Sequence, residues 1–196
     1  MEDQLLVAKT LLLCYPYLED LFDSLTRCEN ECVSSGFYAI FPNEQMRLYE
    51  RIAAYEHRKV GVYNMKYLIE ECFRRGKGAA LSLLKERYLS GVDMPVLMEK
   101  YDVSLRTCYR YIKRGLAELS KALQSLGFDK KRILTEYGNE PLFMTMLNRV
   151  IKEDDAENAG ERGEKKMEKK EINNLPRRPL IYYESAFSAV GRAQRG

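Results

Sequence analysis

The chain has 196 residues, enough for one or two domains, and its 32 Lys and Arg against 29 Asp and Glu leave a net charge of only +3. A chain so nearly balanced is not a polycationic coat for nucleic acid, so any cationic contact surface has to be local. No run of about 18 apolar residues occurs, which argues against a membrane-spanning helix, and residues 1–4 are acidic, unlike the positive start of a signal peptide. We therefore expect a cytoplasmic protein without a membrane partner.

Residues 1–76 are predicted to form an N-terminal helical hairpin. Apolar residues at alternating steps of four and three predict a helix over residues 4–34, in which Pro16 either kinks the helix or starts a second one. A further helix restarts at Asn43, and Gly61 is a candidate boundary before another helix over residues 62–73. The apolar positions behind these predictions are Leu11, Tyr15, Leu18, Phe22, Leu25, Met46, Ile52, Ala53, Val60, Met65, Leu68, Ile69 and Cys72.

An antiparallel hairpin of this kind leaves an apolar seam to be covered. The seam packs either on the chain's own third helix or on a second subunit. Residues 1–76 are therefore a possible oligomerisation region, and a homodimer is one expectation.

Residues 77–127 carry the pattern on which the functional prediction rests. The apolar spacing predicts one helix ending near Ser90, a second over residues 94–101 and a long third helix beginning at Ser104. The breaks fall at residues suited to them: Gly91 at a helix C-terminus, Asp93 as an N-cap ahead of Pro95, a turn at Asp102 and Val103, and Ser104 as a second N-cap. Helix, short turn and helix, with cations on the last, is the pattern of a helix-turn-helix that reads double-stranded DNA.

The third predicted helix separates an apolar stripe from a cationic face. Over residues 104–125 five Lys and Arg accompany one acid, which gives a local net charge of +4. The stripe, at steps of three or four, consists of Cys108, Ile112, Leu116 (or Gly115), Leu119 and Leu123. The outward face consists of Arg106, Thr107, Tyr109, Arg110, Lys113 and Arg114.

A group of residues in this segment also carries a family resemblance. They are Leu84, Arg87, Tyr88, Met94, Leu97, Tyr101 and Val103, followed by Ser-Leu-Arg-Thr-Cys-Tyr-Arg-Tyr at 104–111. With them the segment resembles region four of bacterial sigma factors and, more closely, the sigma-region-four-like activators of phage late genes, of the RinA and ArpU type.

The resemblance implies that the third helix lies in the major groove. By position, Ser104, Arg106, Thr107, Tyr109 and Arg110 would face bases and phosphates, and Lys113 and Arg114 would follow the DNA backbone. It also implies RNA polymerase as a partner, and an accessory transcription regulator of a phage or mobile element.

The C-terminal part is predicted to change from helix to disorder. Residues 128–151 read as two short amphipathic helices, whose apolar positions Phe143, Met144, Met146, Leu147 and Val150 either fold on the core or bind a partner. Residues 152–196 read as a disordered linker and tail, because residues 152–174 are charged and contain no aromatic residue. Residues 175–196 are either a docking peptide or an idle tail.

The sequence gives no constellation typical of an enzyme. The only histidine, His57, has no ligand spacing, and the neighbouring carboxylates Glu70 and Glu71 are predicted to be solvated charges. Reduced, packed thiols are expected for Cys14, Cys28, Cys32, Cys72 and Cys108. We therefore expect no catalysis, no cofactor and no metal site.

Two other functions fit the same pattern. One is a DNA-packaging adaptor resembling phage terminase small subunits, which would form a ring-sized assembly. The other is a helical module that contacts protein or RNA, and such a module would fail to bind duplex DNA at low salt while keeping its helices.

Overall fold

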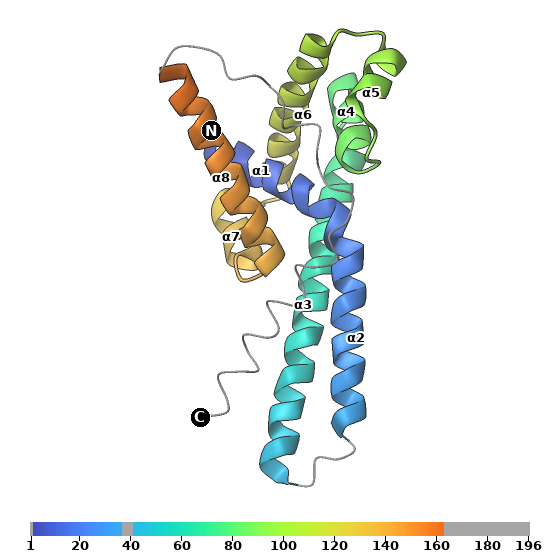
Figure 1. The fold of residues 1–196 in the computed structure, drawn as a ribbon, viewed down its shortest axis with the longest axis vertical. Helices are drawn as coiled ribbons and strands as arrows, with labels where there is room; N and C mark the ends of the chain where they lie inside the picture. The colour runs from blue at the N-terminus through green and yellow to red at the C-terminus, as the bar shows by residue number, and fades with distance from the viewer. Residues whose placement is uncertain (1, 37–40, 163–196) are drawn as a thin grey trace. The chain divides into compact units, whose positions relative to one another are not determined.

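The computed structural model describes residues 2–36 and 41–162 (Figure 1). These residues form helices and no strand, so the predicted all-α class is confirmed. Within the same ranges no helix combines the length and the apolar character needed to cross a membrane. Met1–Glu157 forms one compact unit and Asn158–Gly196 a second, of which the structure describes only the helical residues up to Arg162.

The predicted first helix is divided at Pro16. Helix α1 (Glu2–Cys14) is followed by a 3-10 turn (Tyr15–Tyr17) and by α2 (Leu18–Gly36). The division follows from proline, which lacks the N–H that a continuous helix would use there. Helix α1 then packs against α6 and α7, while α2 lies along α3 (Figure 1).

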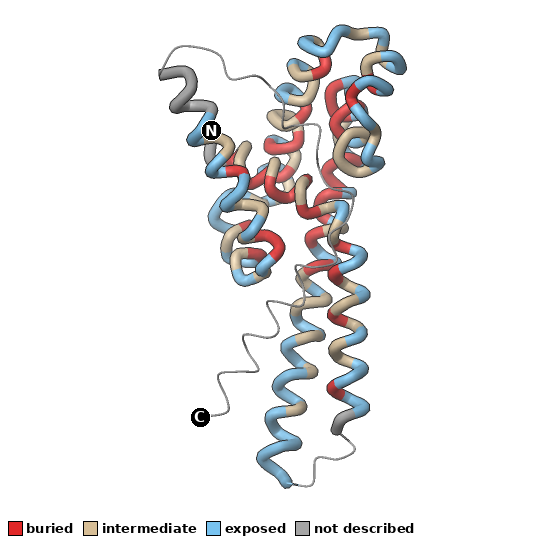
Figure 2. Tube along the Cα trace, in the orientation of Figure 1, coloured by how far each residue is buried: buried red, intermediate tan, exposed pale blue. Residues whose placement is uncertain are grey.

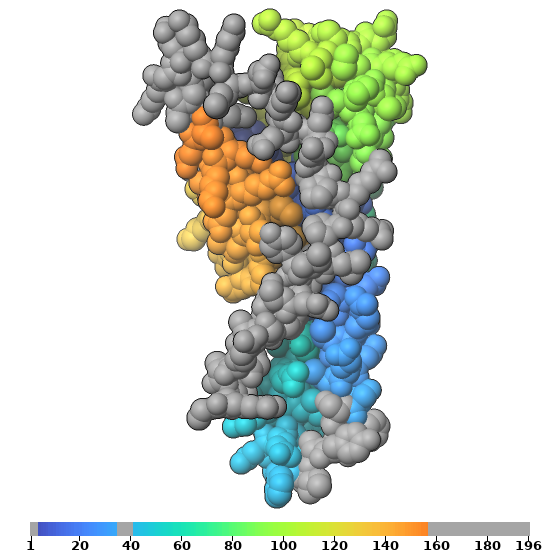
Figure 3. Space-filling model, in the orientation of Figure 1, coloured from blue at the N-terminus to red at the C-terminus, as the bar shows by residue number. Residues whose placement is uncertain are grey.

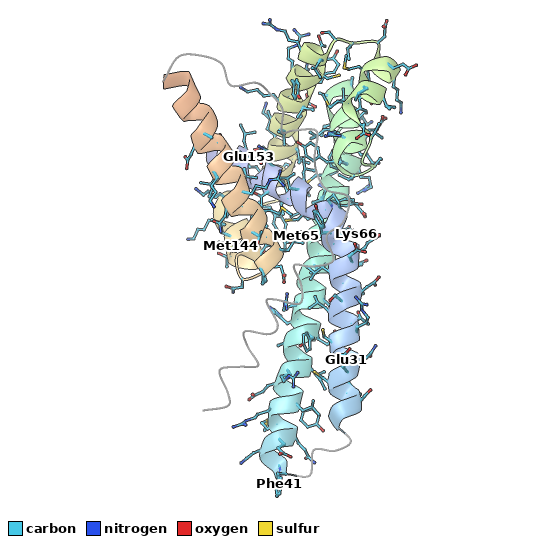
Figure 4. All side chains as sticks on the ribbon, viewed as in Figure 1. Glu31, Phe41, Met65, Lys66, Met144 and Glu153 are labelled. Carbon is cyan, nitrogen blue, oxygen red and sulfur yellow. The ribbon has the colours of Figure 1, made fainter. Side chains whose placement is uncertain are left out.

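Helices α2 and α3 (Pro42–Arg75) form the predicted antiparallel hairpin. Lys59 pairs with Glu29 and Lys66 pairs with Glu19, so positions rise along α3 as they fall along α2. Figure 4 shows Lys66 on the side of α3 that lies next to α2.

The structure corrects the predicted boundary at Gly61, because α3 is continuous through it. A glycine inside a helix costs only about 1 kcal/mol relative to alanine. Here the ion pairs of Lys59 and Lys66 with α2 hold the helix on both sides of Gly61.

The predicted apolar side of the first half of α3 is also corrected. Met46, Ala53 and Val60 are exposed and Ile52 is half-buried. No described residue of α3 before Val62 is buried, as the tube in Figure 2 shows. Met46, Ala53 and Val60 lie on a face that α2 does not cover. Farther along the helix, the predicted Met65, Leu68, Ile69 and Cys72 are buried.

Glu71, predicted to be solvated, is a further correction. Its side chain is only 8% exposed. The carboxylate accepts hydrogen bonds from the Arg74 guanidinium at 2.6 and 2.7 Å and from the Arg75 guanidinium at 2.6 Å. Hydrogen bonds from Arg74 and then Arg75 lower the pKa of Glu71 to about 2. The neighbouring Glu70 is exposed, as predicted, and accepts a hydrogen bond from the Tyr15 hydroxyl at 2.8 Å.

The rest of the described chain is α4 (Ala79–Tyr88), α5 (Met94–Tyr101), α6 (Leu105–Ser125), α7 (Lys130–Tyr137) and α8 (Pro141–Arg162). Phe143 and Val150 of α8 are fully buried, so this helix folds back on the core, one of the two expected uses of its apolar face. Four of the five cysteines are buried as free thiols, and Cys28 is half-buried.

Helix α8 is longer than predicted, because residues 152–162 are helical rather than disordered. The Glu153 carboxylate forms ion pairs with Lys9 of α1 and with Arg149, one turn earlier in α8, each at 2.9 Å. Figure 4 labels Glu153 where α8 passes α1. Although burial raises the pKa of Glu153, these two hydrogen bonds lower it overall. Charges of both signs, read as a sign of disorder, here support the helix at i and i+4. The remainder of the predicted linker and tail, residues 163–196, lies outside the described residues.

Candidate nucleic-acid interface

The candidate interface is built on α4, α5 and α6, which we call the α4–α6 unit. The boundaries of α5 and α6 agree with the predicted second and third helices. A small core joins the three helices, formed by the buried side chains of Leu83, Met94, Leu97 and Cys108. Burial raises the pKa of the Cys108 thiol, so it packs there in its neutral form.

The turn between α5 and α6 is closed by its backbone. Asp102 adopts the left-handed conformation, with φ 47° and ψ 51°. The N–H of Asp102 donates to the carbonyl of Glu99 at 3.2 Å and that of Val103 donates to the carbonyl of Met98 at 3.0 Å. These two bonds make a Schellman motif, in which Val103 and Met98 also pack on the core. The direction in which α6 leaves α5 is therefore fixed locally.

Helix α6 begins at the predicted N-cap. The Ser104 hydroxyl accepts a hydrogen bond from the Thr107 N–H at 3.4 Å and lies 3.1 Å from the Thr107 hydroxyl. Two of the predicted contact residues are thus brought together as a cap, which satisfies a free N–H of the first turn.

At the start of α5 the expected cap is absent. Asp93 occupies the N-cap position without a side-chain cap bond. Its carboxylate lies instead 3.7 Å from the Arg87 guanidinium, which also donates to the carbonyl of Val92 at 3.1 Å. Arg87 is 14% exposed and braces the connection between α4 and α5.

Glu86 joins α4 to α5 in a second way. Its carboxylate accepts hydrogen bonds from the Lys100 ammonium at 2.7 Å and from the Tyr101 hydroxyl at 3.2 Å. Burial and the Glu86 carboxylate raise the pKa of Tyr101. Sequence reasoning did not identify the positioning roles of Glu86 and Arg87, because their partners lie across a turn or on the backbone.

Helix α6 passes very close to α4. Gly115 is buried, and a Cβ placed there would lie 2.7 Å from the carbonyl oxygen of Ala80 and 3.1 Å from Cβ of Leu84. Of the two residues considered for this place in the apolar stripe, Gly115 is buried and Leu116 half-buried. Farther along α6, Leu119 and Leu123 are buried as predicted.

The outward face of α6 is cationic. Arg106, Arg110 and Lys113 are exposed, and no acidic side chain of the described residues forms an ion pair with them. Arg114 is also exposed, but it pairs with Glu118 at 3.1 Å. In the space-filling view the side chains around residues 90–110 stand uncovered (Figure 3).

Two predicted contact residues are less open. Tyr109 is half-buried and packs against the core of the α4–α6 unit, and Thr107 is half-buried at the cap. Their side chains therefore contribute to holding the start of α6 as well as to its surface. The exposed cations Arg106 and Arg110 are one helical turn apart on this surface.

Comparison of the chain with protein families, with curated proteins and with solved structures finds no match. The α4–α6 unit itself is therefore the basis on which we infer a function.

Proposed function

We propose that this chain is a sequence-specific DNA-binding transcription regulator. In this proposal α5 and α6 are the two helices of a helix-turn-helix, and α6 lies in the major groove of double-stranded DNA. The observation that carries the proposal is the left-handed turn at Asp102, which is followed by a helix whose exposed Arg106, Arg110 and Lys113 form no ion pair with another described residue. The proposal is for a regulator of phage or mobile-element type, acting in the cytoplasm.

The cations of α6 divide by position. Arg106 and Arg110 lie in the first turns, where base edges are reached, and an arginine there can bind guanine O6 and N7 together, worth roughly 1–3 kcal/mol of discrimination. Lys113 and Arg114 lie farther along and would neutralise phosphates, each contact adding about −0.9 to the slope of log affinity against log salt. Arg114 would have to share its charge with Glu118, so Lys113 is the clearer phosphate contact.

The remaining proposed contacts lie at the same end of α6. Ser104 and Thr107, already joined at the cap, would add hydrogen bonds to phosphates. Tyr109 would present only the exposed part of its ring.

RNA polymerase is the second proposed partner, and it rests on the resemblance to sigma region four alone. A promoter complex tests it: addition of this chain should increase polymerase occupancy on DNA containing its site. Unchanged occupancy would remove polymerase from the proposal and leave DNA binding untouched.

The experiment that tests the main proposal is selection from a random duplex library, with the full chain at physiological salt. A defined sequence motif is expected. Recovery of unrelated sequences, or no binding to duplex DNA at low salt by a chain with intact helices, would refute it.

A further inference from the structure

An exposed row of apolar side chains runs along α3, on a face that α2 does not cover. Its members are Met46, Tyr49, Ala53, Val60, Tyr63 and Tyr67, which we call the α3 seam. Met46 is 61% exposed, Tyr49 66%, Val60 53%, Tyr63 62% and Tyr67 59%. Single exposed apolar residues are ordinary, but a row of them along one helix face is typical of a contact surface.

The spacing of the α3 seam is that of a helix–helix contact. Met46, Ala53, Val60 and Tyr67 follow one another at steps of seven residues, and Tyr49 and Tyr63 stand three residues after Met46 and Val60. This is the a and d pattern of a coiled coil, whose period of about 3.5 residues keeps one stripe facing a partner helix.

The α3 seam is distinct from the face of α3 that packs on α2. That face carries Lys59 and Lys66, which pair with Glu29 and Glu19 of α2. At 3.6 residues per turn, Val60 and Tyr67 lie roughly a quarter of a turn away from them. Helix α3 thus has two stripes of helix-packing spacing, and α2 occupies only one.

One acid interrupts the α3 seam without leaving a free charge there. Glu56 occupies the d position between Tyr49 and Tyr63. Its carboxylate pairs with Lys59 at 2.7 Å, toward the α2 side of the helix. Lys59 therefore holds the Glu56 carboxylate at the edge of the seam. The small side chain of Ala53 and the side chain of Val60 lie on either side of the Glu56 position.

We propose that the α3 seam is the surface through which two copies of this chain pair. A two-fold pair requires one surface that fits itself, and a heptad stripe on a helix does so. The α3 seam contains no Lys or Arg, which argues against nucleic acid as its occupant. Tyrosine is among the residues that contribute most to binding energy at protein interfaces.

The available area is sufficient for a pair. With roughly 150–250 Å² for each aromatic side chain, the exposed parts of Tyr49, Tyr63 and Tyr67 amount to about 400 Å² per copy, and those of Met46 and Val60 raise the total to about 600 Å². Two copies would bury about 1,200 Å², at the lower end of stable specific interfaces. A reversible dimer is the result expected, and it would place two α6 helices in one particle.

The test is the mass of the full chain by sedimentation equilibrium, without DNA, so that its outcome is independent of the proposed function. At tens of micromolar the wild-type chain should have twice its 22.9 kDa mass. Tyr63→Glu and Val60→Glu should each weaken association at least tenfold, giving a monomer at the same concentration. Ala54→Glu is the matched control, because Ala54 is exposed on α3 outside the seam, and it should stay dimeric.

Circular dichroism should show unchanged helix content for all three variants. A wild-type monomer at tens of micromolar, a ring larger than a dimer, or a Tyr63→Glu chain that pairs as tightly as wild type would overturn the proposal. So would loss of the dimer in a Tyr182→Glu, Tyr183→Glu double variant with Tyr63→Glu unaffected, because the contact would then belong to the C-terminal residues.

Discussion

Alanine in place of Gly115 should destabilise the protein, although alanine favours helix formation. The added Cβ would lie 2.7 Å from the Ala80 carbonyl oxygen and 3.1 Å from its carbonyl carbon, atoms of the α4 backbone that cannot rotate away. Overpacking of this kind typically costs about 1–3 kcal/mol. The gain in helix propensity offsets about 1 kcal/mol of that cost.

Gly61 is the matched control for this substitution. It also lies inside a helix, but a Cβ placed there would meet nothing within 4 Å. Gly61→Ala should therefore raise the free energy of unfolding by about 1 kcal/mol. Urea unfolding followed by circular dichroism should separate the two variants by about 1–3 kcal/mol, with Gly115→Ala the less stable. Equal stability of the two variants would mean that α6 does not approach α4 as closely as described.

Three further outcomes follow from single residues. Asp102→Gly should leave the free energy of unfolding unchanged or slightly raised, whereas Asp102→Val should lower it by about 1–2 kcal/mol, because a β-branched residue is strained in the left-handed conformation; equal urea midpoints would contradict this. Leu97→Ala, at a fully buried core position, should cost about 2–5 kcal/mol by the same assay, and a loss under 1 kcal/mol would argue against that core. The pKa of Glu71 is lowered to about 2, so its ion pairs stabilise the fold above its unfolded pKa near 4.5 and are lost as pH falls from there toward 2. Glu71→Gln should flatten acid unfolding in that window, and an unchanged pH profile would count against the arginine contacts.

Local signals predicted the α4–α6 unit well. The ends of α5 and α6 are set by residues a few positions apart: Pro95 at the first turn, Asp102 in the left-handed conformation and Ser104 at the N-cap. Such caps act within one turn of the chain, so the sequence displays both partners. The apolar stripe of α6 could also be predicted, because its residues are only three or four positions apart.

The features that the sequence did not show depend on which helix packs against each face of its neighbour. The helical spacing of the apolar residues along α3 could be read from the sequence. The sequence did not show that α2 would cover the stripe that contains Lys59 and leave Met46 and Val60 exposed. The extension of α8 depends in part on Lys9, far away in sequence from Glu153.

The same limit applies within the candidate interface. Arg106 and Arg110 are exposed, in agreement with the predicted outward face. This could be predicted because the spacing of residues within a single helix decides which of them share a face. The packing of Tyr109 and the pairing of Arg114 with Glu118 depend on neighbouring side chains and needed the structure.

The most direct test of the central claim, that α6 reads DNA, compares affinities of Arg110→Ala and Lys113→Ala for a selected and a scrambled duplex over a range of salt. Arg110→Ala should reduce the preference for the selected duplex by roughly 5- to 150-fold, equivalent to 1–3 kcal/mol. Lys113→Ala should weaken both duplexes alike and reduce the salt slope by about 0.9. Two variants that behave identically on both duplexes, or that both bind like wild type, would contradict the claim.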